Sequence, residues 1–350
     1  MSNKKNILIT GATGHQGRAL IRALSLSSSS PESESDFHIL APTRNPSSSH
    51  STSLSKSHPT LVSLVRGDLD SPESIRLYST MQCARTARAG YGACFACWRF
   101  RGSALMQMVR RGRASIEYGV SAFVFSSVER GGEYYDDHSV LDRRAKVNVE
   151  RYIRVLGEKG LPWTILRPGF FMENYEGMIG AVAVGVLKYG LKLTTTNQLV
   201  AADDIGCVAA AVFKVNEFTA FRDREPARYA SQILVISGEA STMTQQEEAY
   251  KNATGEPLPA IPRFLARILI AFNGHTKNLL ADIERVHDTR ETGKCPEVGV
   301  QTAAARQAHP GMMTLERWAA ARRLAEGVEA QSTGGTRNNI SVLRMLTGRQ

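Results

Sequence analysis

The chain has 350 residues and a formal net charge of +10, which suits one large α/β domain or a nucleotide-binding domain with a smaller C-terminal part. Its apolar runs are too short for a membrane span, no apolar leader follows the first residues, and five cysteines do not suggest a disulfide framework. We therefore expect a soluble, cytoplasmic protein with no membrane partner. The charge does not predict direct nucleic-acid binding, because residues 81–115 supply most of the excess, with seven arginines and no acid.

The first predicted element is a strand that runs into a glycine-rich turn and a helix. Residues 6–20 read NILITGATGHQGRAL. Gly11 permits a tight turn, Gly14 lets the backbone approach a pyrophosphate, and Gly17 lets the helix pack closely on the strand. The helix N-terminus offers free N–H groups to phosphate. An ordinary strand–helix turn is the alternative to a dinucleotide site. The turn residues that we assign to a cofactor are Gly11, Thr13, Gly14, His15, Gln16 and Gly17.

Two serine-rich segments follow, residues 25–36 and 46–58, on either side of a predicted strand at 37–41. Both are polar and rich in turn-forming residues, so we expect flexible surface insertions there. A third strand is predicted at 60–65. The next helix should begin near Ser71, where the sequence SPES is a plausible cap.

Polar residues at the predicted strand ends are candidates for cofactor contacts. Arg44 follows the second strand, where an acid would favour NAD, so its guanidinium predicts a 2′-phosphate and NADP(H) in preference to NAD(H). A solvated surface arginine is the alternative. Asp68 could accept from the adenine amino group or cap the next helix. Ser126 and Ser127 end a strong strand, at the edge where ligands bind in open sheets, but strand-end serines also cap.

The pattern of a doubly wound sheet breaks between residues 81 and 115, where no clean fourth strand is predicted. If the stretch is genuine, buried charge or a missing strand beside the cofactor should weaken dinucleotide binding. Read one nucleotide out of register, residues 90–102 permit an apolar run and 108–114 an acidic helix start. We therefore hypothesise a frame-disturbed or mis-spliced stretch. An uninterrupted transcript that encodes the stretch as printed would refute this.

The alternating pattern returns after residue 120. Strands are predicted at 121–128, 163–166 and 232–235, helices at 145–159, 174–189 and 203–216, and mainly helix from 259 onward. The order indicates an α/β fold, a Rossmann-type doubly wound parallel sheet with a small, mainly helical C-terminal part. We expect a nucleotide-binding domain over 1–230, a smaller substrate or partner part over 231–327, and a disordered tail over 328–350.

The motifs GATGHQG, TRNP, RGDL, FVFSSVE, KVNVERYI, LPWTILRPGFFMEN and DIG follow one another from residue 7 to about residue 206, with a weaker echo in HPGMMTLERWA. Together they resemble the NmrA-like family, an atypical branch of the short-chain dehydrogenase/reductase superfamily. The resemblance implies a Rossmann core that binds NADP(H) preferentially. The family includes redox-responsive regulators that bind a dinucleotide without turnover, and reductases of the isoflavone-reductase type.

Proton transfer decides between these two classes. Catalytic short-chain dehydrogenases use a Tyr-x-x-x-Lys pair, in which the lysine lowers the phenol pKa. Here Lys146 fits the family's K-x-x-x-E signature with Glu150, but Asp142 stands in the tyrosine position. A carboxylate that is ionised at neutral pH is a poor proton donor. Lys146 is thus the candidate catalytic residue, although we favour a contact between it and the cofactor ribose.

The RPGFFMEN segment resembles the family's loop over the nicotinamide end of the cofactor. The resemblance assigns Pro168 and Phe170 to the pocket floor, and Phe171 and Asn174 to the substrate side. Both phenylalanines could equally be core residues. Cys94 and Cys97 form a lone C-x-x-C pair, so no metal site is expected.

We therefore expect an NADP(H)-binding, redox-sensing regulator with little or no turnover. It would act on a regulatory protein partner, in the nucleus as well as the cytoplasm. The alternative is an NADP-dependent reductase of a small carbonyl or conjugated alkene that uses Lys146. A scaffold without cofactor is the third reading, if residues 81–115 are genuine.

Overall fold

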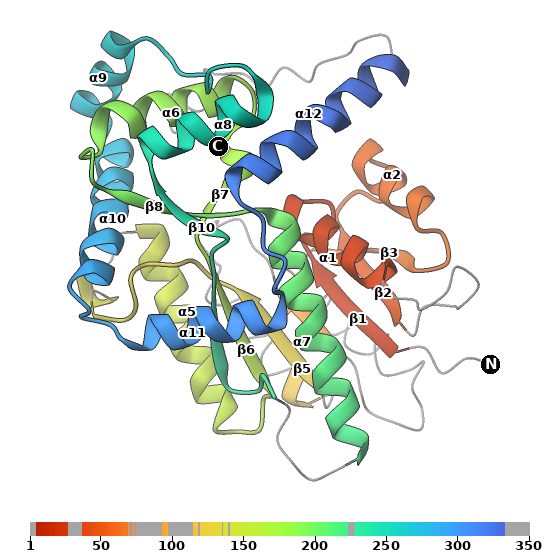
Figure 1. Ribbon diagram of the computed structural model, residues 1–350. Helices are drawn as coiled ribbons and strands as arrows, with labels where there is room; N and C mark the ends of the chain where they lie inside the picture. Colours follow the sequence, from red (N-terminus) through yellow and green to blue (C-terminus); the bar gives the residue numbers. More distant parts are fainter. Residues whose placement is uncertain are drawn as a thin grey trace. The chain divides into compact units, whose positions relative to one another are not determined.

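The computed structural model describes residues 5–26, 37–68, 71, 74, 93–96, 115–117, 120–134, 136–138, 141–222 and 228–332. The chain forms two compact units, and Figure 1 labels most of their helices and strands. The first unit comprises Met1–Gly169, Ala202–Ser237 and Thr289–Met312, and the second Phe170–Ala201, Gly238–Asp288 and Met313–Gln350. Each unit is assembled from separate segments, and the division into domains over 1–230 and 231–327 stays a prediction.

A seven-stranded parallel sheet forms the centre of the first unit, in the order β3-β2-β1-β4-β5-β6-β9. Its strands are β1 (Lys5–Thr10), β2 (Phe37–Thr43), β3 (Val62–Arg66), β4 (Ala93–Ala96), β5 (Ala122–Ser126), β6 (Trp163–Pro168) and β9 (Gln232–Ile236). The strand order reverses between β1 and β4, and doubly wound folds bind ligands outside the strand ends at such a switch point. The predicted Rossmann-type class is confirmed.

The fourth strand is present, so the expectation that residues 81–115 lack a strand is wrong. β4 pairs in parallel with β1 and with β5, and Phe95 lies opposite both Ile9 and Val124. All four of its residues are buried. The strand reads ACFA, which is too short for a periodic pattern, and alanine is depleted in strands. The sheet is continuous at the switch point, so a missing strand is not a reason for weakened cofactor binding, whereas an effect of buried charge stays a prediction. The remaining residues of 81–114 lie outside the described residues.

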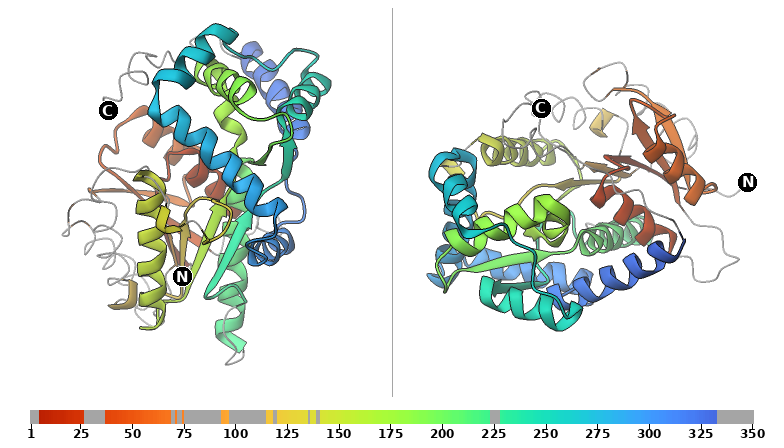
Figure 2. Two further views of the ribbon diagram at one scale, coloured as in Figure 1. Left: turned by 90° about the vertical axis from the view of Figure 1, so that its left-hand side faces the viewer. Right: turned by 90° about the horizontal axis from the view of Figure 1, so that it is seen from above.

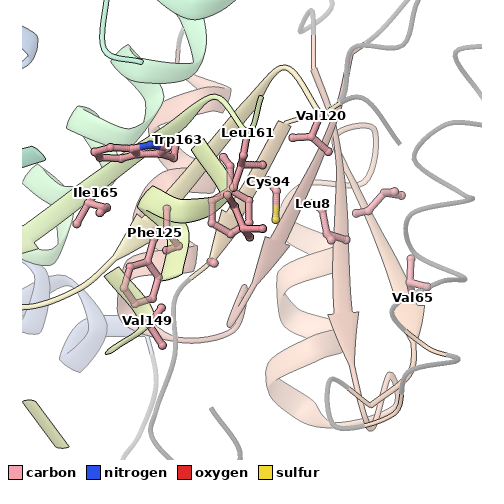
Figure 3. Packing of buried hydrophobic residues seen from close by; sticks show 14 residues of the cluster. Leu8, Val65, Cys94, Val120, Phe125, Val149, Leu161, Trp163 and Ile165 are labelled. Carbon is pink, nitrogen blue, oxygen red and sulfur yellow. The ribbon is translucent and has the colours of Figure 1, made fainter. Parts of the chain in front are cut away.

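Helices cover both faces of this sheet. They are α1 (His15–Ser25), α2 (Ser49–Ser57), α5 (Leu141–Gly157), α7 (Ala202–Arg222) and α11 (Glu297–Ala308), with a short 3-10 turn, η1 (Asp136–His138). α1 and α7 pack closely, because a Cβ at Gly206 would lie 2.4 Å from the carbonyl carbon of Ala19. Figure 2 shows α5 and α7 on opposite sides of the strands. Val149 of α5 packs in one cluster with Leu8 and Phe125 of the sheet (Figure 3).

The second serine-rich segment is ordered, which corrects the expected surface insertion. It forms α2, whose N-cap Ser48 accepts the backbone N–H of Ser51 over 3.3 Å. Leu54 of α2 is buried within the first unit. One N-cap and one buried apolar side chain stabilise this helix. Amino-acid composition does not reveal a helix with so few stabilising features. Residues 27–36 of the first serine-rich segment lie outside the described residues.

The second unit combines a small sheet with most of the C-terminal helices. Its strands are β7 (Phe170–Phe171), β8 (Thr196–Val200) and β10 (Glu239–Thr242), in the order β10-β8-β7. Its helical elements are η2 (Met172–Tyr175), α6 (Gly177–Gly190), α8 (Met243–Thr254), α9 (Arg263–Phe272), α10 (Gly274–Glu291) and α12 (Leu315–Ser332). The helical C-terminal part is as predicted, whereas the sheet is not, because its strands are short and widely spaced in sequence.

The C-terminal helix continues past Gly327, where the tail was expected to begin, to Ser332. Residues 333–350 lie outside the described part of the chain. Within that part, no helix combines the length and the hydropathy needed to cross a membrane.

Candidate functional site

The glycine turn joins β1 to α1 at the switch point of the sheet. Gly11 has a φ of 67°, a conformation that glycine adopts without the strain a side chain would add. The N–H of Gly14 donates to the carbonyl oxygen of Gly11 over 2.9 Å. A Cβ at Gly17 would lie 2.3 Å from the same oxygen. The turn is therefore closed by backbone contacts that leave no room for a side chain at position 17.

α1 begins with an N-terminus that no side chain caps. Gly14 is the N-cap and makes no side-chain cap hydrogen bond, and no acid lies in the first turn. The positive end of the helix dipole and the first N–H groups are thus open to an anion. Thr13 is half-buried and His15 is exposed at this end. The geometry fits a pyrophosphate.

Two of the predicted cofactor residues, Gln16 and Ser126, are in direct contact. The Ser126 hydroxyl donates to Oε1 of Gln16 over 2.6 Å. Gln16 lies in the first turn of α1, and Ser126 ends β5, two strands from β1. The hydrogen bond therefore ties the glycine turn to the carboxyl edge of the sheet.

Arg44 directly follows β2 and is exposed. No acid pairs with it among the described residues, and residues 37–67 carry no acid at all. Asp68, beyond β3, is half-buried. Its backbone N–H donates to the Ser74 hydroxyl over 3.1 Å, and its carbonyl oxygen accepts the N–H of Ser71 over 3.1 Å. Asp68 thus takes part in a capping turn, and an adenine contact stays a prediction.

Sequence reasoning did not identify Arg18 and His50. The N–H of Arg18, one turn into α1, donates to the carbonyl oxygen of Gly14 over 3.0 Å. Its Nη2 lies 3.4 Å from Nδ1 of His50, in the first turn of α2. Arg18 follows the third glycine of the turn directly and could have been noticed. His50 could not, since its segment reads as a loop.

Lys146 reaches the end of β5. Its ammonium donates to the carbonyl oxygen of Ser127 over 2.6 Å. The Ser127 hydroxyl is buried and has no partner among the described residues. Lys146 is therefore tied to the backbone of Ser127 just beyond β5, and Ser127 itself carries a buried hydroxyl that is unsatisfied among the described residues. The side chain of Asp142 lies outside the described portion.

Tyr134, one of the two tyrosines that precede α5, contacts a different lysine. The ammonium of Lys294 lies over the Tyr134 ring, 5.3 Å from the ring centroid.

The residues assigned to the nicotinamide end fall in both units. Pro168 ends β6 in the first unit and pairs with Ile236. Phe170 is half-buried in the second unit, where its ring lies 5.6 Å from that of Tyr175. Phe171 pairs with Val200, and Asn174 is exposed in η2. A common pocket for these residues stays a prediction.

Only one cysteine of the C-x-x-C pair lies among the described residues. Cys94 is buried within β4, and Cys97 lies outside the described residues. Among the residues that are described, no group of three or more His, Cys, Asp or Glu side chains could hold a metal ion.

A model of the NmrA-like family matches residues 3–319. The chain belongs to the NmrA-like family. Similar solved structures include NmrA, described as a negative transcriptional regulator in complex with NAD, at 17% identity and a TM-score of 0.61 over 95% of this chain and 99% of that chain. A Citrobacter sp. triphenylmethane reductase complexed with NADP(H) matches at 14% identity and a TM-score of 0.59, over 91% and 99%. An Escherichia coli NADPH-dependent quinone oxidoreductase complexed with NADPH matches at 18% and 0.57, over 91% and 99%.

In this NmrA-like chain, a buried ion-pair network supports the ends of β5 and β6. Arg130 donates to Glu150 over 2.8 and 2.9 Å and to Asp136 over 2.6 and 3.1 Å. Arg167, which is fully buried, donates to Glu150 over 2.6 Å and to Glu133 over 2.8 Å. Glu150, the acid of the K-x-x-x-E signature, therefore serves the scaffold and joins α5 to two strand ends.

The network makes the stability of this NmrA-like protein pH-dependent. Burial alone would raise the pKa of Glu150, but the guanidinium groups of Arg167 and Arg130 lower it to about 2 from 4.5. Burial opposes the same change in Glu133, whose pKa falls to about 2 through hydrogen bonds from Arg154 and Arg167. Carboxyl groups with depressed pKa stabilise the fold above their unfolded pKa, and this contribution is lost as the pH falls through the folded value.

We expect the free energy of unfolding to fall between about pH 4.5 and pH 2, with Glu150 contributing on the order of 3 kcal/mol. Glu129 works in the opposite direction, because burial raises its pKa despite the opposing charges of Arg167 and Arg130. Its contribution therefore grows as the pH falls from the raised pKa towards about 4.5, and the loss below pH 4.5 comes from Glu150 and Glu133. Urea unfolding from pH 2.5 to pH 7 measures the profile. A flat profile down to pH 2.5 would contradict the assignment.

Proposed function

We propose that the protein binds NADP(H), in preference to NAD(H), as a redox-sensing regulator with little or no turnover. The observation that carries the proposal is the uncapped N-terminus of α1 behind the closed Gly11–Gly17 turn. Similar folds that hold NAD, NADP(H) and NADPH support it, as does the description of NmrA as a transcriptional regulator.

Each part of the site has a role in this proposal. The first N–H groups of α1 hold the pyrophosphate, and Arg44 pairs with the 2′-phosphate. Gln16 and Ser126, joined by their hydrogen bond, border the middle of the cofactor. Lys146 holds a ribose hydroxyl. A nicotinamide bound there supplies hydride chemistry, but Asp142 in place of tyrosine offers no neutral phenol to donate a proton to a carbonyl.

A thermal-shift assay tests the proposal. Saturating NADPH or NADP+ at about 100 times Kd should stabilise the fold by about 2.7 kcal/mol, and a chain of this size should show a rise in Tm of several degrees. NADH and NAD+ should give smaller shifts. Arg44→Ala should reduce the NADP(H) shift to the NAD(H) level and leave the latter unchanged. Stabilisation by none of the four nucleotides would reject the proposal in favour of a scaffold.

A reductase is the second candidate, favoured by the position of Lys146, whose ammonium lies at the carboxyl end of β5 and donates to the Ser127 carbonyl oxygen. NADPH consumption over a panel of carbonyls and enones separates the two functions. For a regulator, we expect no turnover above the rate without protein. Turnover that Lys146→Ala abolishes, and that Lys159→Ala leaves intact, would establish the reductase instead. Lys159 is an exposed lysine just beyond the same helix and controls for loss of charge.

A further inference from the structure

α9 is apolar on two opposite sides, and only one of them is packed. Figure 1 shows α9 next to α6, which it contacts within the second unit. On this inner side Ala266 is fully buried, and Leu269 and Ile270 pack against the apolar cluster of the unit. The outer face carries four large apolar side chains with exposed fractions between 40% and 87%, those of Phe264, Leu265, Ile268 and Phe272. A helix that is apolar all round is normally buried on every side.

The outer face forms one continuous stripe along α9. Phe264, Ile268 and Phe272 follow one another at intervals of four residues, so they lie in a line over successive turns of the helix. Val300 of α11 and Leu324 of α12 are exposed as well, but among the described residues each is the single large exposed apolar side chain of its helix. Single exposed apolar residues are ordinary, whereas a contiguous stripe marks a surface that meets a partner.

Basic residues flank the outer face. Residues 257–281, which contain α9, include no acid. Arg263 and Arg267 are exposed, and helical spacing places both along one edge of the outer face. Arg263 lies over the ring of Tyr189, 5.9 Å from its centroid, and in the described part of the chain no acid pairs with either arginine. The apolar stripe is therefore bordered by positive charge that the described residues do not neutralise.

Two possible partners from the chain itself fit this face poorly. The outer face offers roughly 500 Å², short of the ~800 Å² that each partner contributes to a standard interface. A second copy would also bring identical arginines together without an acid between them. Residues 333–350 fit no better, since they carry three arginines and no acid. The charge and the apolar stripe together require a partner that is both anionic and apolar.

We propose that the outer face of α9 attaches the protein to an anionic lipid surface. The side chains of Phe264, Ile268 and Phe272 enter the boundary between headgroups and acyl chains, and the two arginines pair with the anionic headgroups. A bilayer surface needs no groove to receive a convex helix face. The sequence predicted no membrane partner because its apolar runs are too short for a span, but a helix that lies in the interface needs no span.

Co-sedimentation of the full chain with lipid vesicles tests this. Wild-type protein should bind phosphatidylcholine vesicles that carry about 30% phosphatidylserine, should bind pure phosphatidylcholine at least about tenfold more weakly, and should be released by salt. Phe272→Ser should weaken binding to the anionic vesicles about fivefold to tenfold, because an inserted ring is lost. Arg267→Gln should weaken it about threefold to fivefold, because a headgroup loses its counter-ion.

Two exposed residues outside α9 provide matched controls. Val300→Ser removes an exposed apolar side chain from α11, and Lys159→Gln removes an exposed charge just beyond α5. Neither should change vesicle binding by more than about twofold. All four substituted side chains are exposed, so each variant should keep the Tm of the wild type, which shows that it is folded.

Wild-type protein that stays in solution with both kinds of vesicle overturns the inference. Equal binding to neutral and anionic vesicles overturns it too, because the arginines then play no part. Binding that Phe272→Ser leaves unchanged places the lipid contact elsewhere and has the same consequence. Sedimentation velocity without lipid covers the second copy: a wild-type dimer that Phe272→Ser converts to a monomer assigns the outer face to self-association instead. None of these results bears on dinucleotide binding, which is tested separately.

Discussion

Replacing Gly17 with alanine is expected to abolish dinucleotide binding and to lower the free energy of unfolding by about 1–3 kcal/mol. The added Cβ would lie 2.3 Å from the carbonyl oxygen of Gly11 and 2.6 Å from Cα of Ala12. Both contacts are to backbone, so the turn itself must move. That movement displaces the N–H groups of α1 from the phosphates. Urea unfolding and calorimetric titration with NADP+ measure the two effects.

Gly299 provides a matched control for this substitution. It is the third residue of α11, as Gly17 is the third residue of α1, and a Cβ there meets nothing within 4 Å. Gly299→Ala should therefore raise the free energy of unfolding by up to about 1 kcal/mol, the ordinary gain of alanine over glycine in a helix. If the two variants changed stability in the same direction, the close packing at Gly17 would not limit the turn.

The sequence predicted those helices and strands whose apolar pattern is local and repeats along the chain. β1, β5 and β6 are buried apolar strands, and α1 and α5, which follow the first two of them, are amphipathic. β4 was not predicted, because its four buried residues need only fit between the neighbouring strands β1 and β5, and they show no periodic pattern of their own. α2 was not predicted for a related reason, since its stability comes from the N-cap and from burial of Leu54 more than from helix propensity.

The residues of the candidate site likewise fall into those that a local sequence pattern predicts and those that only the fold brings together. The glycine turn is local, and its residues are contiguous in the sequence. The bond between Ser126 and Gln16 joins residues 110 positions apart, and the contact between Arg18 and His50 spans 32. Such pairs depend on which strands become neighbours, and spacing along the chain does not reveal this. Arg44 was placed by the architecture alone, whereas the contact between Arg18 and His50 depends on the folded α2.

Glu150 shows how a sequence signature can describe the scaffold. Glu150 completes the K-x-x-x-E signature with Lys146, yet the two side chains have different surroundings. Lys146 meets the end of β5, whereas Glu150 is 1% exposed and accepts from Arg130 and Arg167. We therefore expect substitutions at Lys146 to affect the cofactor and substitutions at Glu150 to affect folding.

Glu150→Gln should lower the free energy of unfolding by about 3–5 kcal/mol, because it leaves two buried guanidinium groups without their shared counter-ion. The amide keeps the shape of the carboxyl group and removes its charge, so the loss reports electrostatics more than a cavity. Such a loss is a large part of the 5–15 kcal/mol typical of a native domain. Urea unfolding at pH 7 measures it.

Asp137→Asn is the control, since Asp137 pairs with Arg151 at the surface, where the two side chains are 80% and 55% exposed. An exposed pair of this kind contributes about 1 kcal/mol or less. NADP+ titration at low temperature, where the Glu150→Gln protein remains folded, completes the test. Retained affinity with reduced stability assigns Glu150 to the scaffold. Lost affinity at unchanged stability would instead make it part of the cofactor site.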